Sequence, residues 1–368
     1  MQSIGVSAVT AYTAHKEWAT RPPDERYASV SALYDAARAR RDRTQERAIE
    51  TSEFRTEAED DDALVLLEAS GRTAALTNWS FEQLATIAGA PPKYLRTLPA
   101  PIASSAINFG LQRQGREAHQ LFTERAAPWT VHAITSPRYA RVHHDELASR
   151  VVDLMGDHPA WHLPLGYKDG EFGAERVPSG AYLGDRDMFL FLVDGNRDLE
   201  DPTDASHAGL FRGFILRNSD VGAAALTLDV FLFRAVCGNH IIWGFQHVVG
   251  FRRRHVGASI QEEWTASLDA VRTSLDADSA DDRAMLLRAT SQELGPTREA
   301  VLDAATQRLE LSQKSAAAAY ELAERHETNP RSVWGYVQGL TRLSQGTSWQ
   351  DSRFALDRAA SRLLTTIH

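Results

Sequence analysis

The sequence contains a single cysteine, Cys237, among its 368 residues. One cysteine excludes an intramolecular disulfide framework and any zinc site built from several cysteines. No apolar run approaches the roughly 20 residues that a membrane-spanning helix needs, and the first residues lack the basic and apolar regions of a secretory signal. We therefore expect a cytoplasmic protein with no membrane contact.

Motifs for nucleotide binding and covalent catalysis are also missing. The sequence has no GxxxxGK[ST] loop, no GxGxxG after a strand and no GxSxG elbow, so we assign no cofactor and no catalytic residue. A histidine-rich segment contains His143, His144, Asp145, His158 and His162. Because adjacent histidines on a helix point to different faces, this segment predicts no metal site.

Charge is distributed unevenly along the chain. The formal net charge is −9, whereas residues 205–260 contain six arginines and only two aspartates. This segment also holds the cysteine and the densest aromatic content of the chain. A focused basic surface on an acidic protein is typical of a site for an anionic ligand, so we place the candidate site here.

Hydrophobic periodicity and turn residues predict an α+β fold. We expect an N-terminal arm and helix over 1–62, an α+β core domain with a central antiparallel β-rich sheet over 63–260, and a helical C-terminal region over 261–368. Short helices around the turn at Gly89 are superficially similar to a helix-turn-helix, with Lys93 and Arg96 as phosphate contacts. The Pro91-Pro92 pair stands where a recognition helix would begin, which favours a helical subdomain instead.

The basic segment is expected to form antiparallel strands. Phe211–Arg217 and Leu226–Val236 alternate as strands, and His240–Val249 is expected to return beside them. Asn218, Ser219 and Asp220 have turn chemistry, since short polar side chains bond their own backbone. In the tail we expect several helices, including one long helix over Arg298–His326.

Three uses of this segment compete. In the first, cations and aromatic rings form a groove for single-stranded nucleic acid, because phosphates need cations and unstacked bases need aromatic faces. The candidate contacts are Arg212, Arg217, Arg234, Trp243, Phe245, Arg252, Arg253, Arg254 and His255. In the second, Cys237 acts as a nucleophile with His240 or His255, although a lone cysteine in an apolar run is more often a buried small residue. In the third, the arginines pair with carboxylates and the segment is core.

The motifs RGFILRNSDVG, LFRAVCGNHIIWG and RRRHVG resemble the phage/plasmid-like family called domain of unknown function 932. The family motif falls on Gly213, Asn218, Ser219, Asp220, Gly222, Cys237 and Asn239. FEQLA, GAPPKYLRTLP and INFGL resemble its N-terminal part, and GLTRLSQGTSWQDSRFALDRAASRLL resembles its tail. The resemblance implies a protein of phages and mobile elements, with no established catalytic residues to transfer.

We therefore expect a homo-oligomeric protein that binds single-stranded DNA without nucleotide hydrolysis and promotes annealing. Proteins that anneal single strands on a β-hairpin and helix core in oligomeric rings offer a fold-level analogy. One alternative is a metal-dependent nuclease or other enzyme of a mobile element, in which Asp185 and Asp187 hold Mg²⁺. The other is a counter-defence or regulatory protein that acts through protein contacts.

Overall fold

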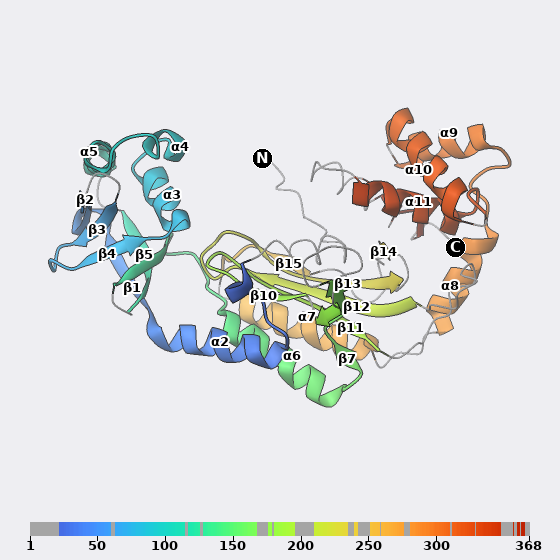
Figure 1. The fold of residues 1–368 in the computed structure, drawn as a ribbon, viewed down its shortest axis with the longest axis horizontal. Coiled ribbons are helices and arrows are strands. Elements are labelled where there is room, and N and C mark those ends of the chain that lie inside the picture. The colour runs from blue at the N-terminus through green and yellow to red at the C-terminus, as the bar shows by residue number, and fades with distance from the viewer. Residues whose placement is uncertain are drawn as a thin grey trace.

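The computed structural model describes residues 22–59, 63–114, 117–125, 128–167, 176–178, 180–195, 210–234, 239–241, 251–257, 259–275, 280–309, 311–327, 329–346, 356, 359–360 and 362–364. The fold is α+β, as the sequence predicts. Three groups of elements follow one another across Figure 1, each with its own apolar cluster of buried side chains. None of the described helices combines the length and apolar character that spanning a bilayer requires.

The first group is a six-stranded sheet with three helices. Its strands lie in the order β1-β5-β6-β4-β3-β2, and only β4 and β6 run parallel. The strands are β1 (Thr44–Glu50), β2 (Phe54–Ala58), β3 (Leu64–Glu68), β4 (Thr73–Leu76), β5 (Ala118–Glu124) and β6 (Thr130–Thr135). The helices are α3 (Asn78–Ile87), α4 (Pro92–Leu95) and α5 (Ala100–Arg113). Because β2 pairs with β3, the strands on either side of residue 62 belong to one sheet.

The second group is a seven-stranded antiparallel sheet covered by helices on one face. Its main path is β10-β11-β12-β13-β14, with β15 paired to β13 and β7 to β11. The strands are β7 (Trp161–His162), β10 (Ala181–Leu183), β11 (Met188–Asp194), β12 (Leu210–Asn218), β13 (Leu226–Arg234), β14 (Asn239–Ile241) and β15 (Phe251–Arg253). The small pair β8 (Leu165–Tyr167) and β9 (Arg176–Pro178) stands apart. The covering helices are α2 (Val30–Arg43), α6 (His144–Asp157) and α7 (Ile260–Leu275).

The third group is helical: α8 (Ala280–Ser291), α9 (Arg298–Leu309), α10 (Gln313–His326) and α11 (Val333–Gly346). The single long helix expected over residues 298–326 is wrong, because Ser312 begins a new helix by accepting a hydrogen bond from the Ser315 amide at 3.1 Å. An N-cap hydroxyl of this kind satisfies a backbone donor that the preceding turn cannot. Trp334 and Tyr336 are the largest buried side chains of this group.

Candidate anion site at the end of the central sheet

Strand register brings two arginines of distant sequence to one face of the central sheet. Arg217 of β12 lies opposite Thr227 of β13, and Thr227 lies opposite Arg252 of β15. Directly opposed residues of antiparallel strands share a face, so the three side chains form a row. Their neighbours Leu216, Leu228 and Phe251 turn to the other face, into the apolar cluster beneath α2, α6 and α7.

The run of three arginines at residues 252–254 is divided between the two faces. Successive residues of an extended chain point to opposite sides, so Arg252 and Arg254 share one side and Arg253 takes the other. Arg253 forms an ion pair with Glu263 of α7, the helix that covers the core face. Two of the three arginines, Arg252 and Arg254, therefore lie on the side of the row, and Arg253 is held in an ion pair on the other side.

A cavity of about 450 Å³ opens beside this row. We call it the arginine cavity, and its lining consists of Tyr139, Arg217, residues 222–225, Thr227, Arg252 and residues 254–256. None of these described lining residues is acidic. Arg217 also contacts Asp187, which immediately precedes β11, with a nitrogen–oxygen distance of 3.0 Å, and this contact fixes its guanidinium at the edge of the cavity. The lining therefore presents several positive charges and suits an anionic ligand.

The turn between β12 and β13 forms one wall of the cavity and contains three of the motif residues named above, Ser219, Asp220 and Gly222. Gly222 has a φ of 87°, in the left-handed region that glycine adopts without strain. Ser219 is fully buried; its hydroxyl donates to the Arg186 carbonyl and accepts from the Ala223 amide at 2.8 Å. Tyr139 donates its hydroxyl to the Ser219 carbonyl at 2.7 Å. These contacts give the wall a fixed shape.

Behind the turn lies a buried polar network that joins the two sheets. The Asn218 amide donates to the Val142 carbonyl at 2.8 Å and contacts Nδ1 of His144 at 3.1 Å. Nε2 of His144 lies 3.1 Å from the Asp220 carboxylate. Burial raises the pKa of Asp220, but His144 and two nearby arginines outweigh this effect and hold the pKa well below its usual range. The carboxylate is therefore charged in the folded protein.

The same network continues into the first sheet. Arg141 forms an ion pair with Glu46 of β1 at 3.1 Å, and His143 contacts the second carboxylate oxygen of Glu46 at 3.0 Å. The His143 contact lowers the pKa of Glu46 to about 2; burial opposes this shift, and Arg141 adds to it. The two histidines expected to diverge on the helix thus pair with carboxylates of different elements.

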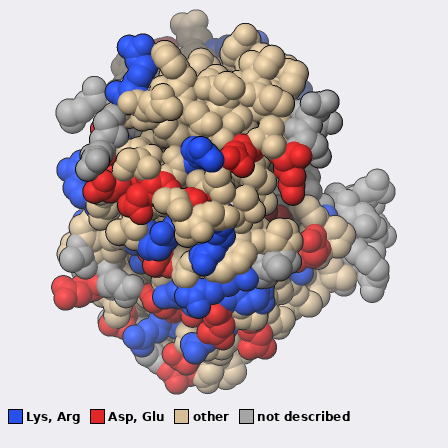
Figure 2. All heavy atoms as spheres, turned by 90° about the vertical axis from the view of Figure 1, so that its left-hand side faces the viewer, with Lys and Arg blue, Asp and Glu red and all other residues tan. Residues whose placement is uncertain are grey.

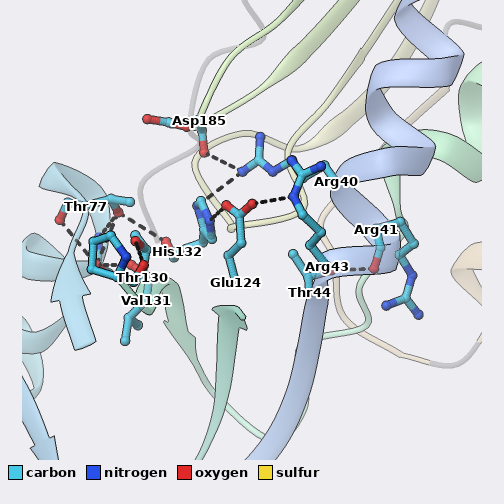
Figure 3. Close-up of polar contacts among 12 residues, drawn as sticks. Arg40, Arg41, Arg43, Thr44, Thr77, Glu124, Thr130, Val131, His132 and Asp185 are labelled. Carbon is cyan, nitrogen blue, oxygen red and sulfur yellow. Dashed lines mark hydrogen bonds and ion pairs between the residues drawn. The ribbon is translucent and has the colours of Figure 1, made fainter. Parts of the chain in front are cut away.

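A second set of polar contacts ties α2 to both sheets (Figure 3). Arg40 donates to the Gly184 carbonyl at 2.8 Å and contacts Nδ1 of His132 at 3.3 Å. Nε2 of His132 contacts Glu124 at 3.1 Å, and Glu124 also accepts from Arg43. Burial and the charge of Arg40 lower the pKa of His132, against the opposing effect of Glu124. These contacts hold α2, the first sheet and the turn at Gly184 together.

His255 lies at the junction of the cavity and the polar network. Its Nδ1 donates to the Ala140 carbonyl at 3.2 Å, and its ring stacks on Tyr139 with centroids 5.1 Å apart. Because the carbonyl only accepts, Nε2 carries a lone pair when the ring is neutral. Burial lowers the pKa of His255 to about 4; the Ala140 contact opposes this shift, and His144 and Arg141 add to it. The ring is therefore neutral at pH 7.

This shift predicts a loss of stability in mild acid. An unfolded histidine takes up a proton below its ordinary pKa of 6.5, whereas folded His255 stays neutral down to about pH 4. The unfolded state therefore binds more protons in this window, and the free energy of unfolding falls as pH falls from 6.5 to 4. One pKa unit corresponds to about 1.4 kcal/mol, so the loss is on the order of 3 kcal/mol.

Urea unfolding at several pH values checks this expectation. His255→Asn retains a donor for the Ala140 carbonyl but does not titrate, so its stability should fall less between pH 6.5 and 4 than that of the unmodified protein. Parallel pH profiles for the two proteins would contradict the assignment.

The structure brings together only part of the predicted contact set. Arg217, Arg252, Arg254 and His255 line the arginine cavity. Arg212 is buried on the core face with an exposed fraction of 3%, and Arg253 turns away. Gly213 and Asn239 lie within β12 and β14, and Arg234 ends β13. Trp243, Phe245 and Cys237 lie outside the described residues.

Sequence reasoning missed Tyr139, Thr227 and Val256 as cavity residues. Thr227 was placed correctly on a strand, but nothing in the sequence reveals the register that puts it between two arginines. Tyr139 reaches the cavity because Val256 pairs with it in an isolated antiparallel bridge and the Ala140 amide donates to the His255 carbonyl. Contacts between segments more than one hundred residues apart leave no local signal.

The acidic pair proposed for Mg²⁺ has a different setting. Asp187 is buried and bound to Arg217, whereas Asp185 is exposed and accepts from Arg40 through its backbone carbonyl. Across the part of the chain that the structure describes, no three histidine, cysteine or acidic side chains are grouped so as to hold a metal ion. The carboxylate of Asp187, which was expected to bind Mg²⁺, thus pairs with the Arg217 guanidinium instead.

No protein-family model matches the chain, and neither the curated proteins nor the solved structures include a significant match. The resemblance to domain of unknown function 932 therefore stays a prediction.

Proposed function

We propose that this protein binds single-stranded DNA through the arginine cavity, without nucleotide hydrolysis, and that it acts as a homo-oligomer in strand annealing. The observation that carries the binding proposal is the register that places Arg217 and Arg252 in one row, with Arg254 beside them and no acidic side chain among the described lining residues. Self-association and annealing rest on the fold-level analogy with proteins that anneal single strands in oligomeric rings.

The dimensions of the cavity favour an unpaired strand. A volume of about 450 Å³ lies in the range of pockets that enclose small molecules. Such a space fits one nucleotide unit, whereas duplex DNA is bound over extended surfaces that neutralise many phosphates. In this proposal the guanidinium groups bind a backbone phosphate, and the Thr227 hydroxyl supplies a neutral hydrogen bond beside them.

The nuclease alternative has less support, because Asp187 is held by Arg217 and no third carboxylate joins it among the described residues. The alternative of a protein that acts only through protein contacts is separated from our proposal by the binding experiment below.

Arg254→Ala and Arg253→Ala form a matched pair for testing the cavity. The two arginines are neighbours in sequence, both exposed, but only Arg254 lines the cavity. We expect Arg254→Ala to weaken binding of a labelled single-stranded oligonucleotide and to reduce the slope of log affinity against log salt by about one. Arg253→Ala should leave the slope unchanged.

Fluorescence anisotropy between 50 and 200 mM salt measures this difference, a range in which phosphate contacts dominate affinity. Equal slopes for the two variants would remove the cavity from the binding surface. Failure of the unmodified protein to bind at low salt would overturn the function. Mg²⁺-dependent cleavage of the oligonucleotide would transfer the assignment to the nuclease alternative.

A further inference from the structure

The first sheet carries a surface on α4 and α5 that differs in charge from the rest of the protein. The chain has 49 acidic residues, yet none lies between Glu82 and Glu117. Lys93, Arg96 and Arg113 supply positive charges within this interval. Figure 2 shows the face of the molecule that contains this group of elements: its upper part is largely uncharged, and basic and acidic side chains are mixed below. The local composition therefore favours an anionic partner.

Large apolar side chains stand exposed on the same surface. Tyr94, Ile102 and Phe109 have exposed fractions of 62%, 55% and 60%, and they make up half of the exposed large hydrophobic side chains among the described residues. Ile102 and Phe109 are seven residues apart and share one face of α5. The opposite face of α5, which includes Ile107 and Leu111, already fills the core. The outer side chains are therefore not needed for packing within the chain.

Aromatic rings and cations are adjacent on this surface. The Arg113 guanidinium lies over the Phe109 ring, 5.4 Å from its centroid. Lys93 is the exposed neighbour of Tyr94 in α4. Exposed aromatic rings with neighbouring cations are the combination that binds unstacked bases and their phosphates.

Helix α3 connects this surface with the arginine cavity. Beside the cavity, Trp79 and Gln83 donate to the Val221 carbonyl at 2.9 and 3.0 Å, and Val221 immediately precedes the cavity residue Gly222. Toward α4, Arg96 donates to the Asn78 side chain at 2.8 Å and lies over the Phe81 ring. These contacts all come from residues 78–83 of α3, a stretch of about 9 Å. A strand of several nucleotides can therefore reach from one site to the other.

We propose that the α4–α5 surface is a second contact site for the same single strand, with Tyr94 and Phe109 stacking on bases and Lys93 and Arg113 contacting phosphates. This inference rests on the proposed function, because the strand is anchored in the arginine cavity. The surface does not have the continuous apolar face with which a helix enters a membrane, since exposed Ser105 and Gln112 interrupt it.

The experiment compares oligonucleotides of two lengths. An oligothymidine of about five nucleotides fills the cavity site alone, whereas one of about twenty spans both sites, given typical footprints of 4–16 nucleotides. We expect the double variant Tyr94→Ala, Phe109→Ala to bind the long oligonucleotide about tenfold or more weakly, since two base stacks are lost and each contributes about fivefold or more. Binding of the short oligonucleotide should be unchanged. When Tyr94→Phe replaces Tyr94→Ala in this double variant, the ring at position 94 is kept, and part of the long-strand affinity should return.

Leu287→Ala is the matched control, because Leu287 is equally exposed but lies on α8 in the C-terminal group. It should change neither affinity.

Unchanged long-strand affinity in the double variant would overturn the inference, and the cavity proposal would stand if Arg254→Ala still weakened both lengths. An equal loss for both lengths would assign the two rings a structural role. Loss of binding to anionic vesicles without loss of oligonucleotide binding would assign the surface to a membrane. No binding by the unmodified protein would overturn both proposals.

Discussion

Replacing Asp220 by alanine should lower the free energy of unfolding by about 3–5 kcal/mol, the effect of removing one partner from a buried charged pair. Asp220 has an exposed fraction of 4% and His144 one of 3%, and they lie 3.1 Å apart. Without the carboxylate, Nε2 of His144 faces no acceptor and the nearby Arg141 loses a counter-charge. Typical domains are stable by only 5–15 kcal/mol, so the variant should unfold at a much lower urea concentration.

A double-mutant cycle with His144→Ala isolates the pair. If the two side chains mainly stabilise each other, the double variant should be less destabilised than the sum of the single variants. Asp42→Ala is the control, because Asp42 forms an exposed i,i+4 pair with Arg38 and such pairs contribute little. A loss of less than 1 kcal/mol for Asp220→Ala would show that the network does not depend on its central carboxylate.

The pKa values of Asp220 and His255 are both lowered in the folded protein, but for different reasons. At Asp220, burial is outweighed by nearby positive groups that stabilise the charged form, whereas at His255 burial disfavours the charged form. The folded pKa of Asp220 lies below the ordinary value of 3.8, so the unfolded carboxyl takes up a proton first as pH falls. The stabilisation is therefore fully present above the unfolded pKa and is lost as pH falls through the folded pKa. In Asp220→Ala, the fall in unfolding free energy below about pH 4 that arises from this carboxylate should be missing. In His255→Asn, the profile should change above pH 4 instead.

Local sequence signals predicted many elements because their causes are local. Ser29 caps α2 by accepting from the Ala32 amide at 3.1 Å, and Val30, Leu33 and Ala37 are buried at the spacing of one helix face. Strand alternation likewise predicted β12 and β13. Hydrogen bonds within one turn and side-chain periodicity depend only on residues that are close in the sequence, so local patterns predict them.

The candidate site was less predictable because it depends on long-range pairing. The three consecutive arginines at 252–254 suggested one basic cluster, but the strand divides them between two faces. Asn218 and Asp220 were expected to shape a turn, and no local pattern indicates their buried contacts with Val142 and His144. Strand register and contacts between two sheets depend on the tertiary structure. A polar motif alone therefore does not distinguish an exposed turn from a turn whose side chains are buried in contacts with other elements.

Replacing Trp334 by alanine should destabilise the C-terminal helical group by about 3–5 kcal/mol, the usual effect of truncating a buried tryptophan. The side chain is fully buried within an apolar cluster formed only by elements after residue 284. That cluster shares no residue with the clusters beneath the arginine cavity and in the first sheet. The loss should therefore appear as an earlier urea transition of the C-terminal helices, followed by helical circular dichroism.

Oligonucleotide binding separates this effect from a role in the proposed function. Under conditions in which the central sheet stays folded, Trp334→Ala should bind the short and long oligonucleotides as the unmodified protein does, since none of the described cavity residues lies after Val256. Leu287→Ala, an exposed substitution on α8, should shift the transition by no more than about 0.5 kcal/mol. A fall in affinity that parallels the loss of C-terminal structure would mean that these helices contribute to the binding surface, and the assignment of the site to the two sheets would need revision.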